Sequence, residues 1–178
     1  FGAACPPILI AQHIPAGFSR SFAERLDREL EMEVSEAQDG DAVRPGRVLI
    51  APGNLHMLLA GAPGALRVVV KDGPLVRYQR PSVDVLFHSA ARLLGRHCVA
   101  ALLTGMGNDG AEGLLAIRQA GGWTAAQDEA TSTVYGMPRE AARLGAASEI
   151  VPLHRMAEQL DAAMRRTARE EVDAGITV

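Results

Sequence analysis

Short apolar runs alternate along the chain with longer segments in which apolar residues recur every three or four positions. The runs are typical of strands buried on both faces, and they predict strands at residues 7–13, 33–37, 47–51, 66–71, 99–103, 123–127 and 149–151. The longer segments predict amphipathic helices at 18–30, 81–95, 110–120, 138–145 and 153–164. This alternation predicts an α/β fold with a doubly wound, mainly parallel sheet and helices on both faces, a three-layer arrangement of the Rossmann type.

The alternation breaks between Val34 and Val70, where the predicted strands follow one another without a helix. A segment rich in proline and glycine, Gly61 to Gly64, predicts a hairpin-like turn between the strands at 47–51 and 66–71. Because strands joined by a short turn pair in antiparallel fashion, we expect an antiparallel edge in this part of the sheet.

The 178 residues are enough for one domain, and the composition, 48% hydrophobic and 22% charged, is that of an ordinary globular protein. We place this domain at residues 1–164 and treat 165–178 as a charged C-terminal tail. A net charge of −3, without any block of lysine and arginine, argues against nucleic acid as a partner. No apolar run approaches the roughly 20 residues that a membrane helix needs, so we expect no insertion into a membrane.

The two cysteines, Cys5 and Cys98, are distant in sequence and match neither zinc-binding nor redox spacing. We expect both to be buried as small apolar residues in a reducing cytoplasm, without a disulfide. The histidines show no metal-ligand spacing either, so the sequence predicts no metal site.

A glycine-rich turn lies between a predicted strand and a predicted helix. The spacing of Gly105, Gly107 and Gly110 fits the dinucleotide-binding pattern, and Asp128 lies near the distance at which a ribose-binding acid is sought. Asp109 argues against this function, because its carboxylate would lie beside the pyrophosphate at the helix N-terminus that should bind it. Several strands also precede the turn, whereas this pattern usually belongs to the first strand and helix. Dinucleotide binding is therefore the weaker alternative.

His13 and Asp109 each follow an apolar run that predicts a strand. The carboxyl ends of parallel strands meet at one edge of a sheet, so the two side chains share that edge. A histidine that acts as a general base needs a carboxylate to hold its tautomer, and the N–H groups of a glycine-rich turn can hold an oxyanion. A simpler interpretation is also open, in which His13 makes a structural hydrogen bond and Asp109 caps a helix.

Five segments resemble, in the right order, the catalytic domain of the CheB-type chemotaxis receptor methylesterases, from about Pro7 to about Leu160. They are Ala11-Gln-His-Ile-Pro-Ala-Gly-Phe18, Ile50-Ala-Pro-Gly53, Arg80-Pro-Ser-Val-Asp-Val-Leu-Phe-His88, Thr104-Gly-Met-Gly-Asn-Asp-Gly-Ala111 and Tyr135-Gly-Met-Pro-Arg139. Long blocks in a fixed order are more specific than any single motif. The resemblance therefore favours the catalytic interpretation of His13 and Asp109.

The resemblance implies a serine hydrolase that removes methyl groups from glutamate γ-methyl esters on bacterial chemoreceptors and that often deamidates receptor glutamines too. It implies His13 as the base, Asp109 as the residue that orients it, and the backbone N–H of Met106 as an oxyanion donor. It implies no cofactor. The implied partners are the methylated cytoplasmic helices of chemoreceptors, together with an N-terminal receiver domain or a fused methyltransferase, and the implied location is the cytoplasm.

One part of the resemblance has no counterpart in these residues. The family's nucleophilic serine lies on a turn after a first strand, upstream of the Gln-His segment, but none of the twelve residues before His13 is a serine. Since the chain also begins with Phe1, we expect a fragment that lacks this strand and turn. Ser19 and Ser21 follow His13 and fit the first turn of a helix. The alternative is a receptor-binding relative that has lost the nucleophile and is not catalytic.

Overall fold

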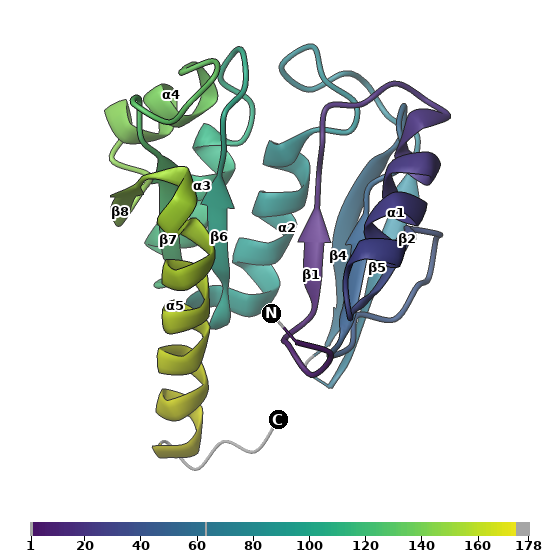
Figure 1. Ribbon diagram of the computed structural model, residues 1–178, viewed down its shortest axis with the longest axis horizontal. Coiled ribbons are helices and arrows are strands. Elements are labelled where there is room, and N and C mark those ends of the chain that lie inside the picture. The colour runs from purple at the N-terminus through teal and green to yellow at the C-terminus, as the bar shows by residue number, and fades with distance from the viewer. Residues whose placement is uncertain (1, 63, 174–178) are drawn as a thin grey trace. The chain divides into compact units, whose positions relative to one another are not determined.

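The computed structural model describes residues 2–62 and 64–173, and the chain divides into two compact units, Phe1–Ser89 and Ala90–Val178 (Figure 1). The boundary between the units falls inside helix α2 (Val83–Leu94). Each unit contains a parallel three-stranded sheet, and the first unit also contains an antiparallel pair of strands. The fold is therefore of the mixed α/β class that the sequence predicts.

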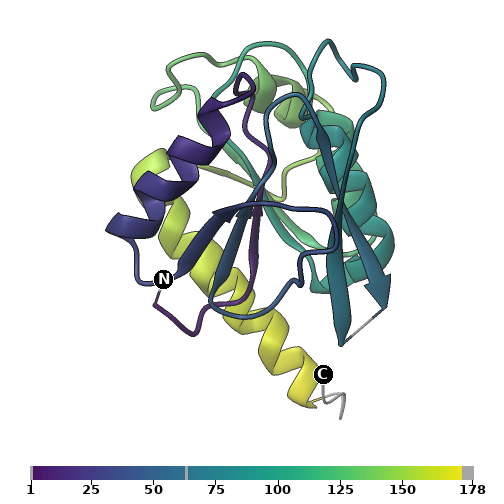
Figure 2. The same ribbon diagram turned by 90° about the vertical axis from the view of Figure 1, so that its right-hand side faces the viewer.

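The first unit is built on a parallel sheet with the strand order β1-β3-β2. Figure 2 shows α1 on one side of these strands and the hairpin of β4 and β5 on the other. The elements in chain order are β1 (Ile8–Ile10), α1 (Phe18–Glu29), β2 (Glu33–Glu36), β3 (Arg47–Ile50), β4 (His56–Ala62), β5 (Ala65–Lys71) and α2.

The central strand of this sheet, β3, alternates its side chains between two separate clusters of buried residues. Val48 and Ile50 pack with Ala23 of α1, whereas Leu49 packs with Met57 of the hairpin. This alternation follows from the two-residue period of a strand. Because both faces of β3 are covered, its residues after Arg47 are continuously apolar, which is the pattern that predicts the strand.

The hairpin differs from the prediction. β5 pairs in antiparallel fashion with β4, with His56 opposite Lys71, and not with the strand at 47–51. The sequence does not predict β4: Met57 and Leu59 are buried, but the residue between them is also apolar, so no alternation of apolar and polar residues marks the strand. The predicted antiparallel edge is also too wide, because β2 and β3 are parallel and only β4 and β5 are antiparallel.

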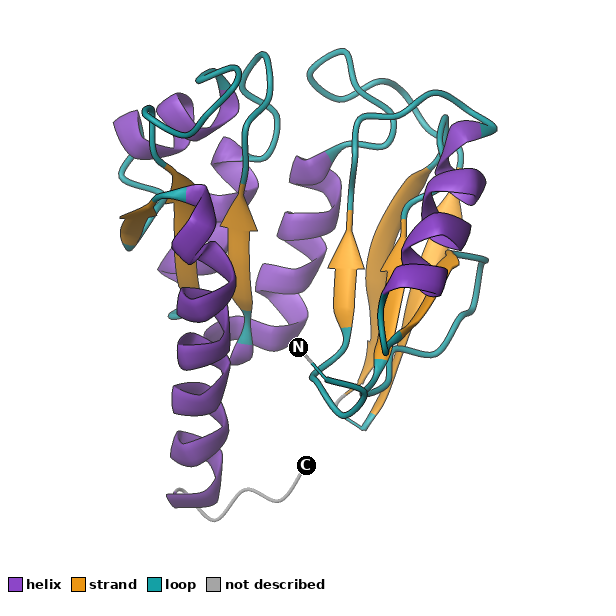
Figure 3. Cartoon of the chain, viewed as in Figure 1, coloured by secondary structure: helices purple, strands orange, loops and turns teal. Residues whose placement is uncertain are grey.

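The second unit contains a parallel sheet with the strand order β6-β7-β8. Figure 3 shows α5 on one face of its strands and α3 on the other. The elements are η1 (Gly95–His97), β6 (Val99–Leu102), α3 (Ala111–Gln119), β7 (Trp123–Gln127), α4 (Met137–Arg143), β8 (Glu149–Val151) and α5 (Leu153–Asp173). Ala125, Val151 and Met156 form the buried cluster that joins β7 and β8 to α5.

The last helix continues into the predicted charged tail. α5 continues through residues 165–173, so most of the predicted charged tail is helical, and residues 174–178 lie outside the described residues. The division at residue 164 stays a prediction. Over the described part of the chain, no helix combines the length and the apolar character that crossing a membrane would take.

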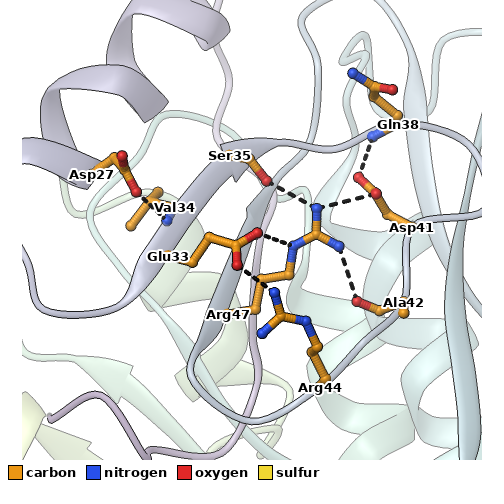
Figure 4. Close-up of polar contacts among 9 residues, drawn as sticks. All are labelled: Asp27, Glu33, Val34, Ser35, Gln38, Asp41, Ala42, Arg44 and Arg47. Atoms are coloured by element: carbon orange, nitrogen blue, oxygen red, sulfur yellow. Dashed lines mark hydrogen bonds and ion pairs between the residues drawn. The ribbon is translucent and has the colours of Figure 1, made fainter.

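An ion-pair network joins the amino ends of β2 and β3 (Figure 4). Arg47 Nη2 donates to Asp41 Oδ1 at 3.1 Å, and Arg47 Nε lies 3.1 Å from Glu33 Oε1. Glu33 also pairs with Arg44. The side chain of Arg47 is mostly buried, and its charge is matched by two carboxylates. We therefore assign this network to the stability of the sheet, since functional sites of α/β proteins lie at the opposite, carboxyl edge.

Both cysteines are free and buried, as the sequence predicts. Burial raises the pKa of the Cys98 thiol to about 12, because the thiolate would lose its hydration. We expect iodoacetamide at pH 8 to leave Cys98 unmodified in the native protein and to alkylate it fully once guanidinium chloride has unfolded the chain. Mass spectrometry of the peptide that carries Cys98 measures the difference. Equal alkylation in the two states would contradict the buried position.

Candidate active site

In the first unit, the segment that carries His13 leaves the carboxyl end of β1 and leads into α1. His13 itself is half-buried. This segment lies directly against the loop that follows β3: a Cβ built on Gly53 would be 2.6 Å from the carbonyl carbon and oxygen of Pro15. Only glycine permits so close an approach of two backbones. The carboxyl ends of β1 and β3 thus hold the His13 segment in place.

The two serines after His13 have structural partners. Ser19 is fully buried, its hydroxyl donates to Glu36 Oε1, and its Oγ accepts the backbone N–H of Gly53 at 2.9 Å. The Ser21 hydroxyl donates to the carbonyl oxygen of Phe18 at 3.0 Å, within the first turn of α1. Ser19 therefore joins α1, β2 and the loop after β3, and neither serine is presented as a nucleophile would be.

In the second unit, the glycine-rich turn leaves the carboxyl end of β6 and leads into α3, so the structure has the predicted strand, turn and helix. Gly107 has φ 95°, and Gly110, which caps the helix, has φ 87°; both values favour glycine. Asp109 lies just before the cap and is 1% exposed. Met106, in the same turn, has a side chain that is 80% exposed. The buried Asp109 and the exposed Met106 thus lie three residues apart in one turn.

A second loop, Val134 to Met137, holds this turn from the side. The backbone N–H of Gly105 donates to the carbonyl of Val134 at 3.1 Å, and the backbone N–H of Met137 donates to the carbonyl of Gly105 at 2.8 Å. A Cβ built on Gly136 would be 2.6 Å from that same Gly105 oxygen and 3.2 Å from the Cα of Met106. The shape of the turn therefore depends on a glycine 30 residues further along the chain.

A buried amide at the end of β7 supports the start of the turn. Gln127 Oε1 accepts the backbone N–H of Thr104 at 2.8 Å, and Gln127 Nε2 donates to the carbonyl of Thr131 at 2.7 Å. Asp128 Oδ1 accepts the backbone N–H of Thr131 at 3.0 Å. Asp128, the candidate ribose-binding acid, thus stabilises a local turn, which removes one support from the dinucleotide alternative.

Sequence reasoning finds the turn but misses Gln127 and Gly136. Gly136 belongs to a segment that resembles the methylesterases, but the resemblance does not indicate that this glycine packs against the Gly105 turn. Gln127 carries no signal, since a polar residue that ends a strand is common. Over the described residues, no group of three or more histidine, cysteine and acidic side chains is placed to hold a metal ion.

The predicted site residues lie on both units. Met106 and Asp109 lie together in the turn after β6, in the second unit, and His13 lies after β1, in the first. All three follow the carboxyl end of a parallel strand, which is where α/β proteins place catalytic and binding residues.

These features define an α/β protein with its chemistry-bearing residues at strand ends, and comparison with known proteins gives the family. Residues 2–160 match the family model of the CheB methylesterases, so the chain belongs to this family, and the predicted resemblance is confirmed.

Three relatives illustrate the similarity. The chain is 58% identical over 158 residues to a Rhodospirillum rubrum protein named protein-glutamate methylesterase/protein-glutamine glutaminase 2, covering 89% of this chain and 44% of that protein. It is 53% identical over 155 residues to the protein-glutamate methylesterase/protein-glutamine glutaminase of Escherichia coli O157:H7, covering 87% and 44%. The chain thus spans less than half the length of these curated relatives. The crystal structure of the Thermotoga maritima CheB methylesterase catalytic domain superposes with a TM-score of 0.86 at 37% identity, covering 90% of this chain and 85% of that one.

Proposed function

We propose that this chain is the hydrolytic part of a protein-glutamate methylesterase, which demethylates glutamate γ-methyl esters on bacterial chemoreceptors and also deamidates receptor glutamines. The observation that carries the proposal is the family match over residues 2–160, which includes the strand, turn and helix around Asp109. The names of the curated relatives give both activities.

In the proposed mechanism, His13 is the general base and Asp109 orients its imidazole and stabilises the imidazolium. A serine outside these 178 residues supplies Oγ, which bonds to the ester carbonyl carbon while His13 takes its proton. The backbone N–H of Met106 donates to the resulting oxyanion. The carbon–methoxy bond then breaks, and His13 passes the proton to the methoxide, which leaves as methanol. Water, deprotonated by His13, hydrolyses the acyl-enzyme to the free glutamate and regenerates the serine.

The burial of Asp109 supports its assigned role. A carboxylate that is 1% exposed is shielded from water, so its charge acts more strongly on a neighbouring imidazolium than an exposed carboxylate would. Met106 is 80% exposed, so a substrate can reach the turn at this residue.

The proposed substrate also defines the partners and the location. The methylated glutamates of chemoreceptors lie on cytoplasmic helices, so we place the protein in the cytoplasm with these helices as its partner. A receiver domain or a methyltransferase in the same polypeptide is the further partner that the family suggests. Nucleic acid is not among the proposed partners, because the net charge is −3 and the basic residues form no block.

Methanol release from membranes that contain methylated receptor tests the function. The full product of the gene is expected to release methanol, and Ser19→Ala in that protein is expected to retain the activity. The serine substitution should instead lower the free energy of unfolding by about 1–3 kcal/mol, because Glu36 and the Gly53 N–H lose a buried partner.

The outcomes separate the alternatives. A full gene product that binds receptor but releases no methanol would support a receptor-binding relative without catalysis. Loss of methanol release in a folded Ser19→Ala variant would place the nucleophile within these residues and overturn the mechanism. Circular dichroism establishes that the variant is folded.

A further inference from the structure

The loop between β5 and α2, residues 72–82, is anchored by a buried histidine. His56 is 3% exposed, and its Nε2 donates to the carbonyl oxygen of Pro74 at 2.9 Å. Its Nδ1 accepts the backbone N–H of Ser82 at 3.3 Å. One imidazole thus joins the two ends of the loop. His56, for which the sequence predicts no role, therefore fixes the conformation of this loop.

Arg80 anchors the same loop to the carboxyl edge of the sheet. Its guanidinium pairs with Asp72, and its Nη2 donates to Asn54 Oδ1 at 2.8 Å, while the backbone N–H of Asn54 donates to the carbonyl of Arg80 at 3.1 Å. Asn54 follows Gly53, the residue in contact with Pro15 of the His13 segment. The loop therefore lies at the same edge of the first unit as His13, as Figure 1 shows for the segments after β1 and β5.

The tip of this loop is a two-residue turn in an unusual conformation. Val76 and Gln79 exchange two backbone hydrogen bonds, of 3.1 and 2.9 Å, around Arg77 and Tyr78. Arg77 has φ 51° and Tyr78 has φ 64°. Two positive φ values define the type I′ turn, which strongly favours Asn-Gly, so two large side chains here cost free energy.

Two side chains at the tip, those of Leu75 and Tyr78, are hydrophobic and exposed. Tyr78 is 92% exposed and Leu75 is 58% exposed, which makes Tyr78 the most exposed large hydrophobic residue of the described chain. The side chain of Arg77 is 36% exposed, and its Nε lies 3.8 Å from the buried carboxylate of Asp84 in α2. We define Leu75 to Tyr78 as the tip. It is a rigid element, tied down at three places, that presents a tyrosine and a leucine to water.

We propose that the tip docks the protein substrate, with Tyr78 and Leu75 contacting an apolar side chain on the receptor surface that carries the modified glutamate. This inference rests on the proposed function, which requires a protein partner beside His13. Tyrosine on a rigid loop suits this task, because it supplies a large contact area and loses little conformational entropy on binding. The strain in the turn is then the cost of placing these side chains where the substrate passes.

Two variants of the full gene product separate the effect of the Tyr78 ring from the effect of the turn conformation. Tyr78→Ser removes the aromatic ring, and the double substitution Arg77→Asn with Tyr78→Gly introduces the residues that the turn prefers. Both are expected to raise the KM for methylated receptor about tenfold, the loss that is typical of one contact residue in an interface, with kcat changed less than twofold. The double variant keeps a turn sequence that this conformation favours, so a raised KM in it reports the loss of the tyrosine ring and not the loss of the turn.

A small ester and a matched surface variant are the controls. N-acetyl-glutamate γ-methyl ester has no surrounding protein surface, so the ratio of receptor to small-ester kcat/KM is expected to fall about tenfold in both tip variants. Leu30→Ser removes an exposed leucine, 42% exposed, at the far end of α1, and is expected to leave this ratio unchanged.

Co-sedimentation with receptor-containing membranes reports docking whether or not the ester is hydrolysed. A smaller bound fraction for both tip variants supports the docking role even if the unaltered protein releases no methanol, an outcome that would overturn only the proposed catalysis. An unchanged KM and an unchanged bound fraction would overturn the docking role. So would an equal loss of activity on receptor and small ester, because that would show a distorted site.

Discussion

Replacing Asp109 with asparagine in the full gene product is expected to lower the turnover of methylated receptor by about 10⁴-fold, the loss seen when the aspartate of a serine-protease triad is changed in the same way. Asparagine has nearly the shape of aspartate, so it fits the position of a side chain that is 1% exposed. It can hold the imidazole of His13 in the wrong tautomer and cannot stabilise an imidazolium. The chemistry should therefore fail while the fold is kept. Methanol release at saturating receptor measures the change.

His13→Ala should cause a loss of similar size, and the variant that carries both substitutions should be little worse than either alone, because residues of one catalytic unit act non-additively. Asp128→Asn is the matched control. This carboxylate also follows a parallel strand, but it accepts hydrogen bonds from Thr131 and should affect stability rather than turnover. A tenfold or smaller loss for Asp109→Asn would mean that this carboxylate has only the capping role that the sequence leaves open.

Local patterns predict the strand, turn and helix around Asp109 better than they predict the strand pairing of the hairpin. The turn from Gly105 to Gly110 follows a continuously apolar strand and precedes an amphipathic helix, so three neighbouring segments each carry the signal for their own conformation. The structure has all three where the sequence predicts them. Ser19 is also interpreted correctly as a residue of the first helical turn, because its neighbours have helical periodicity.

The hairpin shows where such patterns fail. In β4, the least exposed residues, Met57 and Leu59, alternate with residues that are apolar too, so the sequence has no period of two. The Gly61 to Gly64 segment marks the turn, but it does not reveal which strand precedes it. Pairing depends on contacts between strands, and these are not encoded in the few residues around the turn.

Support from distant residues is the part of the site that the sequence does not reveal. Gln127 and Gly136 contact the turn through its backbone, and a backbone contact leaves no complementary residue type on the other side. Asp109 can be proposed from the sequence because the role proposed for it depends on its side chain. Gln127 and Gly136 act through a hydrogen bond to the backbone and a close approach to the backbone, so only the structure identifies them.

Gly136→Ala is expected to lower kcat about a hundredfold, the smaller end of the loss that follows removal of one oxyanion donor. Alanine is compatible with the Gly136 φ of −106°, so the expected loss of kcat comes from a steric clash and not from backbone strain. The new Cβ would be 2.6 Å from the Gly105 carbonyl oxygen and 3.1 Å from the Gly107 nitrogen, and both are backbone atoms that cannot rotate away. The two loops must separate, which weakens the hydrogen bonds that join Gly105 to Val134 and Met137.

Separation of the loops moves the Met106 N–H, and an oxyanion donor works only within about 2.7–3.1 Å of the position that the oxyanion will occupy. The effect should therefore appear in kcat, with the KM for receptor changed far less, and the free energy of unfolding should fall by about 1–3 kcal/mol, as in other overpacked sites. Thr133→Ala, at an exposed residue directly before this loop, is the matched control and should leave both quantities unchanged. Steady-state methanol release and urea unfolding measure the two effects. If Gly136→Ala kept full turnover with the stability loss, the turn would be structural, and the oxyanion donor would have to be sought outside the Met106 backbone.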